Sequence, residues 1–181
     1  MKNLFAALEK QGYLAALARE APELAREVAA ASRMSWLPIA LNVRMVEAAA
    51  ASFGEERGLE ILAGCVFAQF ETPLWKGFIG SAVRLLGTDP GLLGRWIPPA
   101  FSLVFRDCGR WSVESPAPHE LRAVVRELPG PLATHRLWLR SLAIGMTPLF
   151  TLCGTDGRST LEDVDPRARQ ASYRLCWKPR G

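Results

Sequence analysis

The stretch THRLWLRSLAIGMTPLFTLCG, residues 134–154, decides how this chain folds. If a helix begins near Pro131, residues that recur at spacings of three and four share one of its faces. That face carries one histidine among apolar side chains: Leu132, His135, Leu139, Leu142, Met146, Leu149 and Cys153. Pro148 removes one helical hydrogen bond and predicts a kink, or a restart at Thr147. We therefore expect a long helix with one buried face.

Four segments around this helix alternate between apolar and polar residues, as half-buried strands do. Two precede it, at residues 111–114 and 121–126, and two follow it, at 159–164 and 170–178. In the last segment the predicted inner face holds Ala171, Tyr173, Leu175 and Trp177, and the outer face Gln170, Ser172, Arg174 and Lys178. Strands joined by short turns pair antiparallel. The order predicts a four-stranded, mostly antiparallel sheet backed by the long helix.

Only helices are expected before residue 109. The residues that separate them are Gly12 or Pro22, then Gly54, Pro73 and Pro90. Pro98 and Pro99 are expected to interrupt the segment that begins at Pro90. We assign the chain to the α+β class, with an N-terminal helical subdomain followed by a ββαββ sheet. We expect one domain: a helical N-terminal extension (1–35), a helical part (36–108) and a ββαββ part (109–181).

The charge distribution argues against a nucleic-acid partner. Residues 1–100 carry ten basic and ten acidic side chains, and residues 101–181 carry 12 and 8, which gives the net charge of +4. These basic residues are dispersed, whereas nucleic-acid binders carry a dense basic stripe. The longest uncharged runs, residues 61–70 and 141–155, are too short to span a bilayer. We expect neither a nucleic-acid partner nor a transmembrane segment.

The cysteines do not form a metal motif. They are far apart in the sequence, without a C-x-x-C pair: Cys65, Cys108, Cys153 and Cys176. A zinc site needs three or four converging ligands, usually with one close pair. The N-terminal apolar residues are broken by charges, unlike a secretory signal. We therefore expect no metal, and free thiols in a reducing cytoplasm.

No catalytic pattern is found. The sequence has no G-x-S-x-G elbow, no P-loop and no dinucleotide fingerprint. His135 could be an axial ligand or a general base, but no His, Asp or Glu stands three or four residues from it. We interpret it as a structural residue, a neutral ring bonded to a backbone carbonyl at the edge of the core. His119 is interpreted as an exposed turn residue. We predict no catalytic residues and no enzymatic activity.

The order of elements, with the ending Tyr173-Arg174-Leu175-Cys176-Trp177, resembles a superfamily of helical-plus-sheet sensor domains. The superfamily includes haem-nitric-oxide-binding domains, vinyl-reductase-type ligand domains and subunits of the transport-particle trafficking complex. The sequence is most similar to an uncharacterised paralogous family abundant in myxobacteria. The resemblance covers roughly residues 36–178. It implies a sensor-like scaffold, either with an apolar pocket between helices and sheet or with a docking surface.

The haem-binding members of this superfamily provide a contrast. In them a proximal histidine lies on the helix before the sheet, and a Tyr-x-Ser-x-Arg clamp for the haem carboxylates precedes the last long helix. The matching segment of this chain, residues 96–107, contains no histidine, and residues 134–139 read Thr-His-Arg-Leu-Trp-Leu. Both signatures are missing, so we predict no haem and no other cofactor.

The leading functional hypothesis is a cytoplasmic sensory or regulatory domain that binds a small apolar ligand between helices and sheet. Aromatic residues in the middle of the chain, the close-approach residues Gly77 and Gly80, and the kink at Pro148 motivate it. The predicted pocket residues are Trp75, Phe78, Trp96, Phe101, His135, Leu139 and Met146. Two alternatives stay open. One is an interaction module without a ligand, such as a homodimer or a scaffold for a protein partner. The other is an enzyme whose residues meet only in space.

Overall fold

The computed structural model describes residues 9, 12–30, 38–70, 77, 80–81, 83–84 and 87–178. The chain forms two compact units, Met1–Lys76 and Gly77–Gly181, which are described in turn. The predicted helix after Pro73, with the pocket candidates Trp75 and Phe78, lies largely outside the described residues. None of the helices described is long and apolar enough to cross a membrane.

The first unit is helical, as predicted. Its described helices are α2 (Tyr13–Glu20), α3 (Pro22–Ala30), α4 (Ile39–Phe53) and α5 (Glu55–Phe70). The Tyr13 hydroxyl donates a buried hydrogen bond of 2.6 Å to the Met45 carbonyl, which ties α2 to α4. Gly58 of α5 lies against the backbone of Ala49, where an added Cβ would come within 2.7 Å. The backbones of α4 and α5 therefore touch, and Gly54 between them has the positive φ of 80° that ends α4.

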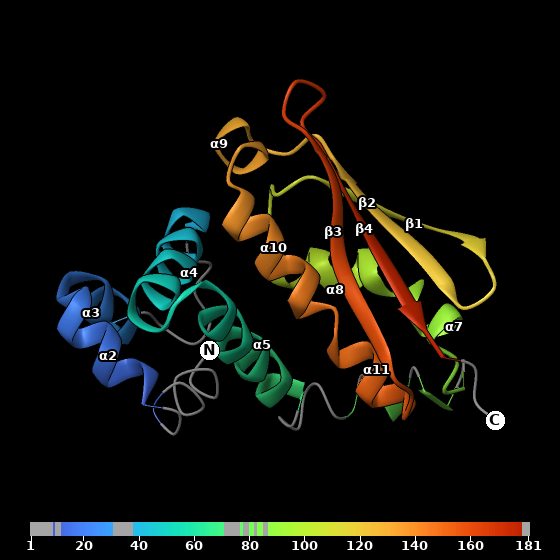
Figure 1. Cartoon of the computed structure of the whole chain (residues 1–181), viewed down its shortest axis with the longest axis horizontal. Coiled ribbons are helices and arrows are strands. Elements are labelled where there is room, and N and C mark those ends of the chain that lie inside the picture. The colour runs from blue at the N-terminus through green and yellow to red at the C-terminus, as the bar shows by residue number, and fades with distance from the viewer. Residues whose placement is uncertain are drawn as a thin grey trace. The chain divides into compact units, whose positions relative to one another are not determined.

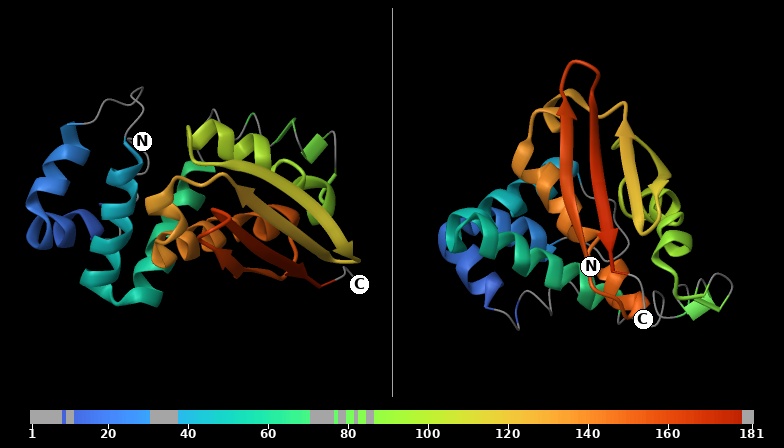
Figure 2. Two further views of the ribbon diagram at one scale, coloured as in Figure 1. Left: turned by 90° about the horizontal axis from the view of Figure 1, so that it is seen from above. Right: turned by 45° about the vertical axis from the view of Figure 1, so that its right-hand side comes forward.

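The second unit holds the sheet. Its elements are α7 (Pro90–Gly94), α8 (Ile97–Val104), β1 (Arg110–Ala117), β2 (Glu120–Arg126), α9 (Gly130–Ala133), α10 (Arg136–Gly145), α11 (Pro148–Cys153), β3 (Gly157–Asp165) and β4 (Gln170–Trp177). The strand order is β1-β2-β4-β3, and every neighbouring pair is antiparallel. α8 packs on β1 and α10 on β3 (Figures 1 and 2). The α+β fold with a helix-backed antiparallel sheet is confirmed.

The long helix predicted over residues 131–153 is divided into α9, α10 and α11. The restart near Thr147 occurs as predicted, with Pro148 in the first turn of α11. The earlier break, at Thr134 and His135, was not predicted. It occurs because His135 caps a new helix instead of continuing the old one. The apolar face survives both breaks. Its buried members are Leu132, Leu139, Leu142, Met146 and Cys153, while His135 and Leu149 are half-buried.

The two short helices before the sheet belong to the sheet's unit, whereas the sequence placed them with the helical part ending at 108. α7 begins where the Asp89 carboxylate accepts a hydrogen bond from the Leu92 amide at 2.9 Å. Pro98 and Pro99, expected only to interrupt a helix, lie in the first turn of α8. A proline costs little there, because the first amides of a helix have no intrahelical partner.

The alternation of β4 is confirmed on its inner face, where Tyr173 and Leu175 are fully buried. Ser172 lies on the opposite face, where polar side chains were predicted, and yet it is only 2% exposed. The reason is that Arg122 of β2 donates to the Ser172 hydroxyl at 3.5 Å and pairs with Glu162 of β3 at 3.0 Å. Two charged side chains from neighbouring strands thus cover the serine.

Gly157 of β3 is held against the sheet-facing side of α11. A Cβ at this position would lie 2.3 Å from Cδ1 of Phe150, whose ring is buried. We predict that Gly157→Ala lowers the free energy of unfolding by about 1–3 kcal/mol, because the ring must leave its position. Urea denaturation followed by circular dichroism measures the change.

Gly145→Ala is the matched control in the same unit. Gly145 ends α10, and an added Cβ would have no atom of the described residues within 4 Å. This variant is expected to be as stable as the parent or slightly more so, because alanine favours the helix. Equal losses in the two variants would contradict the proposed packing of Phe150 on Gly157.

Candidate ligand site

A continuous series of aromatic contacts joins the inner face of the sheet to the helices. Tyr173 of β4 stacks on Trp111 of β1 with ring centroids 5.4 Å apart, and Trp111 contacts Phe101 of α8 at 4.2 Å. Phe101 stacks on Phe105 at 5.7 Å, and Phe105 meets Trp138 of α10 edge-on at 6.1 Å. We call these five residues the aromatic series. Pairs of this kind contribute beyond the area that they bury, so the series holds β1, β4, α8 and α10 together.

The predicted pocket residues that the structure describes fall at different places in this core. Leu139 is buried on the apolar face of α10, and Met146 is buried at the C-cap of that helix. Phe101 belongs to the aromatic series, and Trp96 is half-buried at the start of α8. The structure brings Phe101 into contact with Trp111, a residue that the sequence did not select. That the predicted residues line a ligand cavity stays a prediction.

His135 is the N-cap of α10. Its Nδ1 accepts a hydrogen bond of 3.1 Å from the backbone amide of Trp138. The predicted bond of the ring to a backbone carbonyl stays a prediction, while the cap has a simple cause. The first amides of α10 lack intrahelical acceptors, so a side chain that caps the helix must offer a lone pair. The ring therefore fixes the start of α10 and, with it, the backbone that carries Trp138.

Removing this cap tests the structural role of His135. His135→Ala should lower the free energy of unfolding by about 1 kcal/mol, because the backbone amide of Trp138, in the first turn of α10, loses its acceptor. His135→Asn, which restores a side-chain oxygen acceptor, should recover most of the loss. Thermal and urea denaturation of the three proteins measure the series. A stability loss that asparagine fails to recover would contradict the capping role.

The Tyr173 hydroxyl is a buried polar group without a hydrogen-bond partner among the described residues. The side chain is 0% exposed, and its neighbours in register on β2 and β3 are Ala123 and Leu161. Burial raises the pKa of the Tyr173 phenol well above its usual value, because the phenolate would lose its hydration. An unpaired buried hydroxyl lowers stability, or else it has a hydrogen-bonding ligand or water.

Tyr173→Phe separates these possibilities. If the hydroxyl has no partner, the variant should be about 1 kcal/mol more stable at neutral pH. The raised pKa also makes the stability of the parent depend on alkaline pH. Above about pH 10 the unfolded state loses a proton that the folded state keeps, so the free energy of unfolding falls by about 1.4 kcal/mol per pH unit. Below that pH this contribution is constant, and the variant should lack it. Urea denaturation between pH 7 and pH 11 measures both effects.

Tyr13 provides the control for this test. It is the chain's other tyrosine, and its hydroxyl donates to the Met45 carbonyl. Tyr13→Phe should therefore lose about 1 kcal/mol at neutral pH. If Tyr173→Phe is also destabilising, the Tyr173 hydroxyl is hydrogen-bonded to a water or a ligand in solution.

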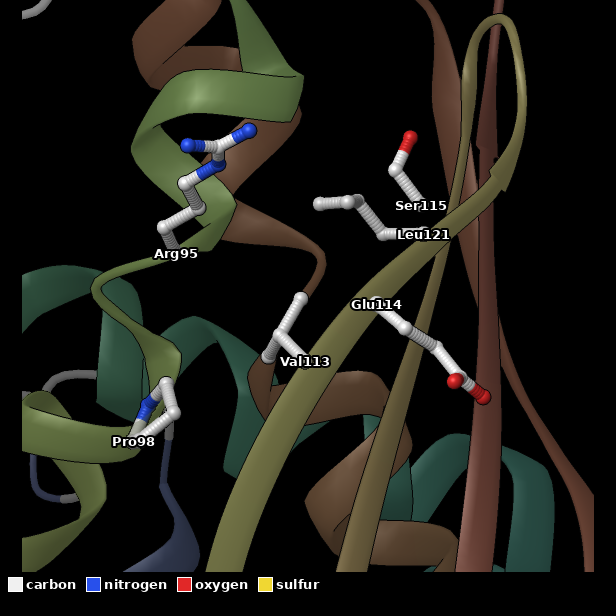
Figure 3. A pocket seen from close by; sticks show the side chains of 6 residues that line it. All are labelled: Arg95, Pro98, Val113, Glu114, Ser115 and Leu121. Carbon is white, nitrogen blue, oxygen red and sulfur yellow. The ribbon is translucent and has the colours of Figure 1, made fainter.

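A cavity of about 370 Å³ lies elsewhere in the second unit, between the α7–α8 turn and the β1–β2 hairpin (Figure 3). Its lining residues are Arg95, Pro98, Val113, Glu114, Ser115 and Leu121. None of them was predicted. The sequence gives no sign that this turn meets this hairpin; the one hint is Gly94, whose missing side chain leaves room for Leu121.

The described residues include no cluster of three or more His, Cys, Asp or Glu side chains suited to a metal ion. Cys108 and Cys153 are buried cysteines that form no disulfide with a described residue. Burial, with the nearby charge of Asp107, raises the pKa of the Cys108 thiol. A raised thiol pKa disfavours the thiolate, which is the nucleophilic and metal-binding form. The two aspartates Asp163 and Asp165, both expected in a turn, have different places. The Asp165 carboxylate accepts hydrogen bonds from the backbone amides of Arg167 and Ala168 in the turn, whereas Asp163 lies within β3, in register with Ser172 of β4.

No protein-family model matches the chain, and no curated protein matches it. Solved structures do. A crystal structure of an Fe(II) unliganded H-NOX protein from K. algicida has a TM-score of 0.65 and 10% identity, over 99% of this chain and 95% of that one. An H-NOX structure from work on the function of heme distortion has a TM-score of 0.66 and 6% identity, over 98% and 92%. An oxygen-binding H-NOX domain related to soluble guanylate cyclases, in its oxygen complex, has a TM-score of 0.60 and 7% identity, over 98% and 93%.

At these identities the likeness concerns the fold alone. The chain has an H-NOX-like fold, and the resemblance stated from the sequence is confirmed at this level. Its finer part, a kinship with vinyl-reductase-type domains and with one paralogous family, stays a prediction.

Proposed function

We propose that the chain is a non-enzymatic sensory or regulatory domain that binds a small apolar ligand between helices and sheet, without haem. The H-NOX-like fold over nearly the whole chain carries this proposal. Kinship with vinyl-reductase-type ligand domains is part of it. Fold alone does not define a function, so the residues that would form the site supply the remaining support.

The residues present do not fit a haem held as in the haem-binding members of the superfamily. α8 is the helix before the sheet, and residues 96–107 contain no histidine. The chain's two tyrosines begin Tyr-Leu-Ala and Tyr-Arg-Leu, so neither starts a Tyr-x-Ser-x-Arg clamp. α8 carries Phe101, which lies on Trp111. The absence of both signatures supports a ligand other than haem.

The interior beneath α8 and α10 supports an apolar ligand. The aromatic series presents ring faces and edges, and the Tyr173 hydroxyl is the polar group in it that lacks a partner among the described residues. Ligand sites combine a mainly apolar lining with a few polar groups that fix orientation. A small apolar molecule with one hydrogen-bond acceptor suits this interior.

The positions of the histidines support the absence of enzymatic activity. His135 caps α10 through Nδ1. His119 is exposed in the turn between β1 and β2, with its ring edge-on to Trp177 at 6.0 Å. A general base works beside a nucleophile inside a cleft that excludes water. A capping residue and a hairpin-turn residue suit structural tasks better.

Two measurements on the full chain test this proposal. Protein produced with added haem precursor and iron should show no stoichiometric Soret band after purification. Native mass spectrometry of protein isolated from its own host should show a small molecule that is lost on denaturation. In the Tyr173→Phe variant the bound fraction should fall, since the ligand loses its hydrogen-bond donor.

Each part of the proposal can fail separately. A stoichiometric Soret band would refute a haem-free site. Protein that leaves its host without any bound molecule would refute the ligand-binding role and favour the interaction module. Light scattering would then show whether the partner is a second copy of the chain.

A further inference from the structure

The cavity between the α7–α8 turn and the β1–β2 hairpin has an apolar floor. Leu121 is 1% exposed, and its side chain sits where Gly94 lacks one, since a Cβ there would lie 2.1 Å from Leu121 Cδ1. Val113 and Pro98, both half-buried, form apolar walls (Figure 3). Because Leu121 is held on Gly94, its place in the floor is set before any ligand binds.

Two charged residues, Arg95 and Glu114, line this cavity. Arg95 is exposed on the α7–α8 turn, and its guanidinium has no hydrogen bond or ion pair with any residue that the structure describes. Glu114 also lines the cavity, but its carboxylate points away (Figure 3) and pairs with Arg122 at 3.7 Å. Successive side chains of a strand lie on opposite faces, so Glu114 does not neutralise Arg95. Arg95 is therefore a lining cation whose charge no described anion neutralises.

The remaining polar groups define which anion fits. The Ser115 hydroxyl donates to the Glu120 carbonyl at 3.2 Å, so its proton is already used within the hairpin and is not a donor for an anion. Pro98 and Pro99 remove two of the first amides of α8, which would otherwise be available to an anion. A phosphate needs several N–H donors or cations, and this cavity offers one guanidinium. A guanidinium matches the two oxygens of a single carboxylate.

We propose that this cavity binds a small monocarboxylate with a short apolar tail. The carboxylate pairs with the Arg95 guanidinium at the mouth, and the tail lies on Leu121, Val113 and Pro98. The volume of about 370 Å³ is at the lower end of the range for small-molecule sites. This site is separate from the interior proposed above for an apolar ligand, and it stands whether or not that interior site exists.

Hexanoate is the probe for this proposal. Titrated into the ¹⁵N-labelled full chain, it should cause saturable amide shifts at Val113 and Leu121. Hexan-1-ol has the same tail without the charge, and acetate has the charge without the tail. Each should bind at least about tenfold more weakly, because each keeps only one of the two contacts.

Arg95→Gln tests the charged contact and should weaken hexanoate binding by about tenfold. The residue is exposed, so the substitution should leave the stability unchanged. Arg158→Gln is the matched control. Arg158 is an exposed arginine on β3, whose guanidinium likewise has no partner among the described residues, and it does not line the cavity.

The control variant should bind hexanoate as the parent does. Three results would overturn the proposal: equal weakening in the two arginine variants, hexan-1-ol binding as tightly as hexanoate, or the absence of saturable shifts at Val113 and Leu121. The host-derived molecule sought by native mass spectrometry does not enter these comparisons, so this inference and the proposed function fail independently.

Discussion

The position of Trp111 between Tyr173 and Phe101 is the contact on which the second unit depends. It joins a strand near the end of the chain to a helix before the sheet, with centroids 5.4 and 4.2 Å from the Trp111 ring. Each such pair adds roughly 1 kcal/mol beyond the apolar area that it buries. Through Phe105 the same packing reaches Trp138, whose backbone is held by the His135 cap. The sheet, α8 and α10 are therefore fixed relative to one another by aromatic contacts.

The cavity follows from the end of that packing. Along the inner face of β1 the side chains shrink from Trp111 to Val113 to Ser115. At Trp111, α8 packs on β1 through Phe101. Two and four residues farther on, the smaller side chains no longer reach the turn that precedes α8, and the space of about 370 Å³ remains. One decrease in side-chain size thus accompanies both the aromatic packing at one end of β1 and the cavity at the other.

The sequence predicted those features that depend on local periodicity. Alternation placed Tyr173 and Leu175 on the inner face of β4, and helical spacing placed Leu139 and Leu142 on the buried face of α10. It failed where the outcome depends on distant partners. Ser172 is buried because Arg122 and Glu162 cover it, and Arg122 lies 50 residues away. Trp111 was identified as a strand residue, but its contacts with Tyr173 and Phe101 depend on which strands become neighbours. For the same reason the cavity could not be foreseen, since its two sides meet only in the folded chain.

The likeness to H-NOX structures at 6–10% identity shows how different the requirements of a fold and of a site are. An architecture needs apolar residues of suitable size at the right period, and many sequences satisfy that condition. A cofactor site needs particular atoms at particular positions, and one substitution removes it. α8 illustrates both cases: Phe101 and Phe105 keep it packed on the sheet and α10, while no histidine between residues 96 and 107 can ligate a metal. A helix of this kind can therefore preserve a fold while the side chains that it presents to the interior change.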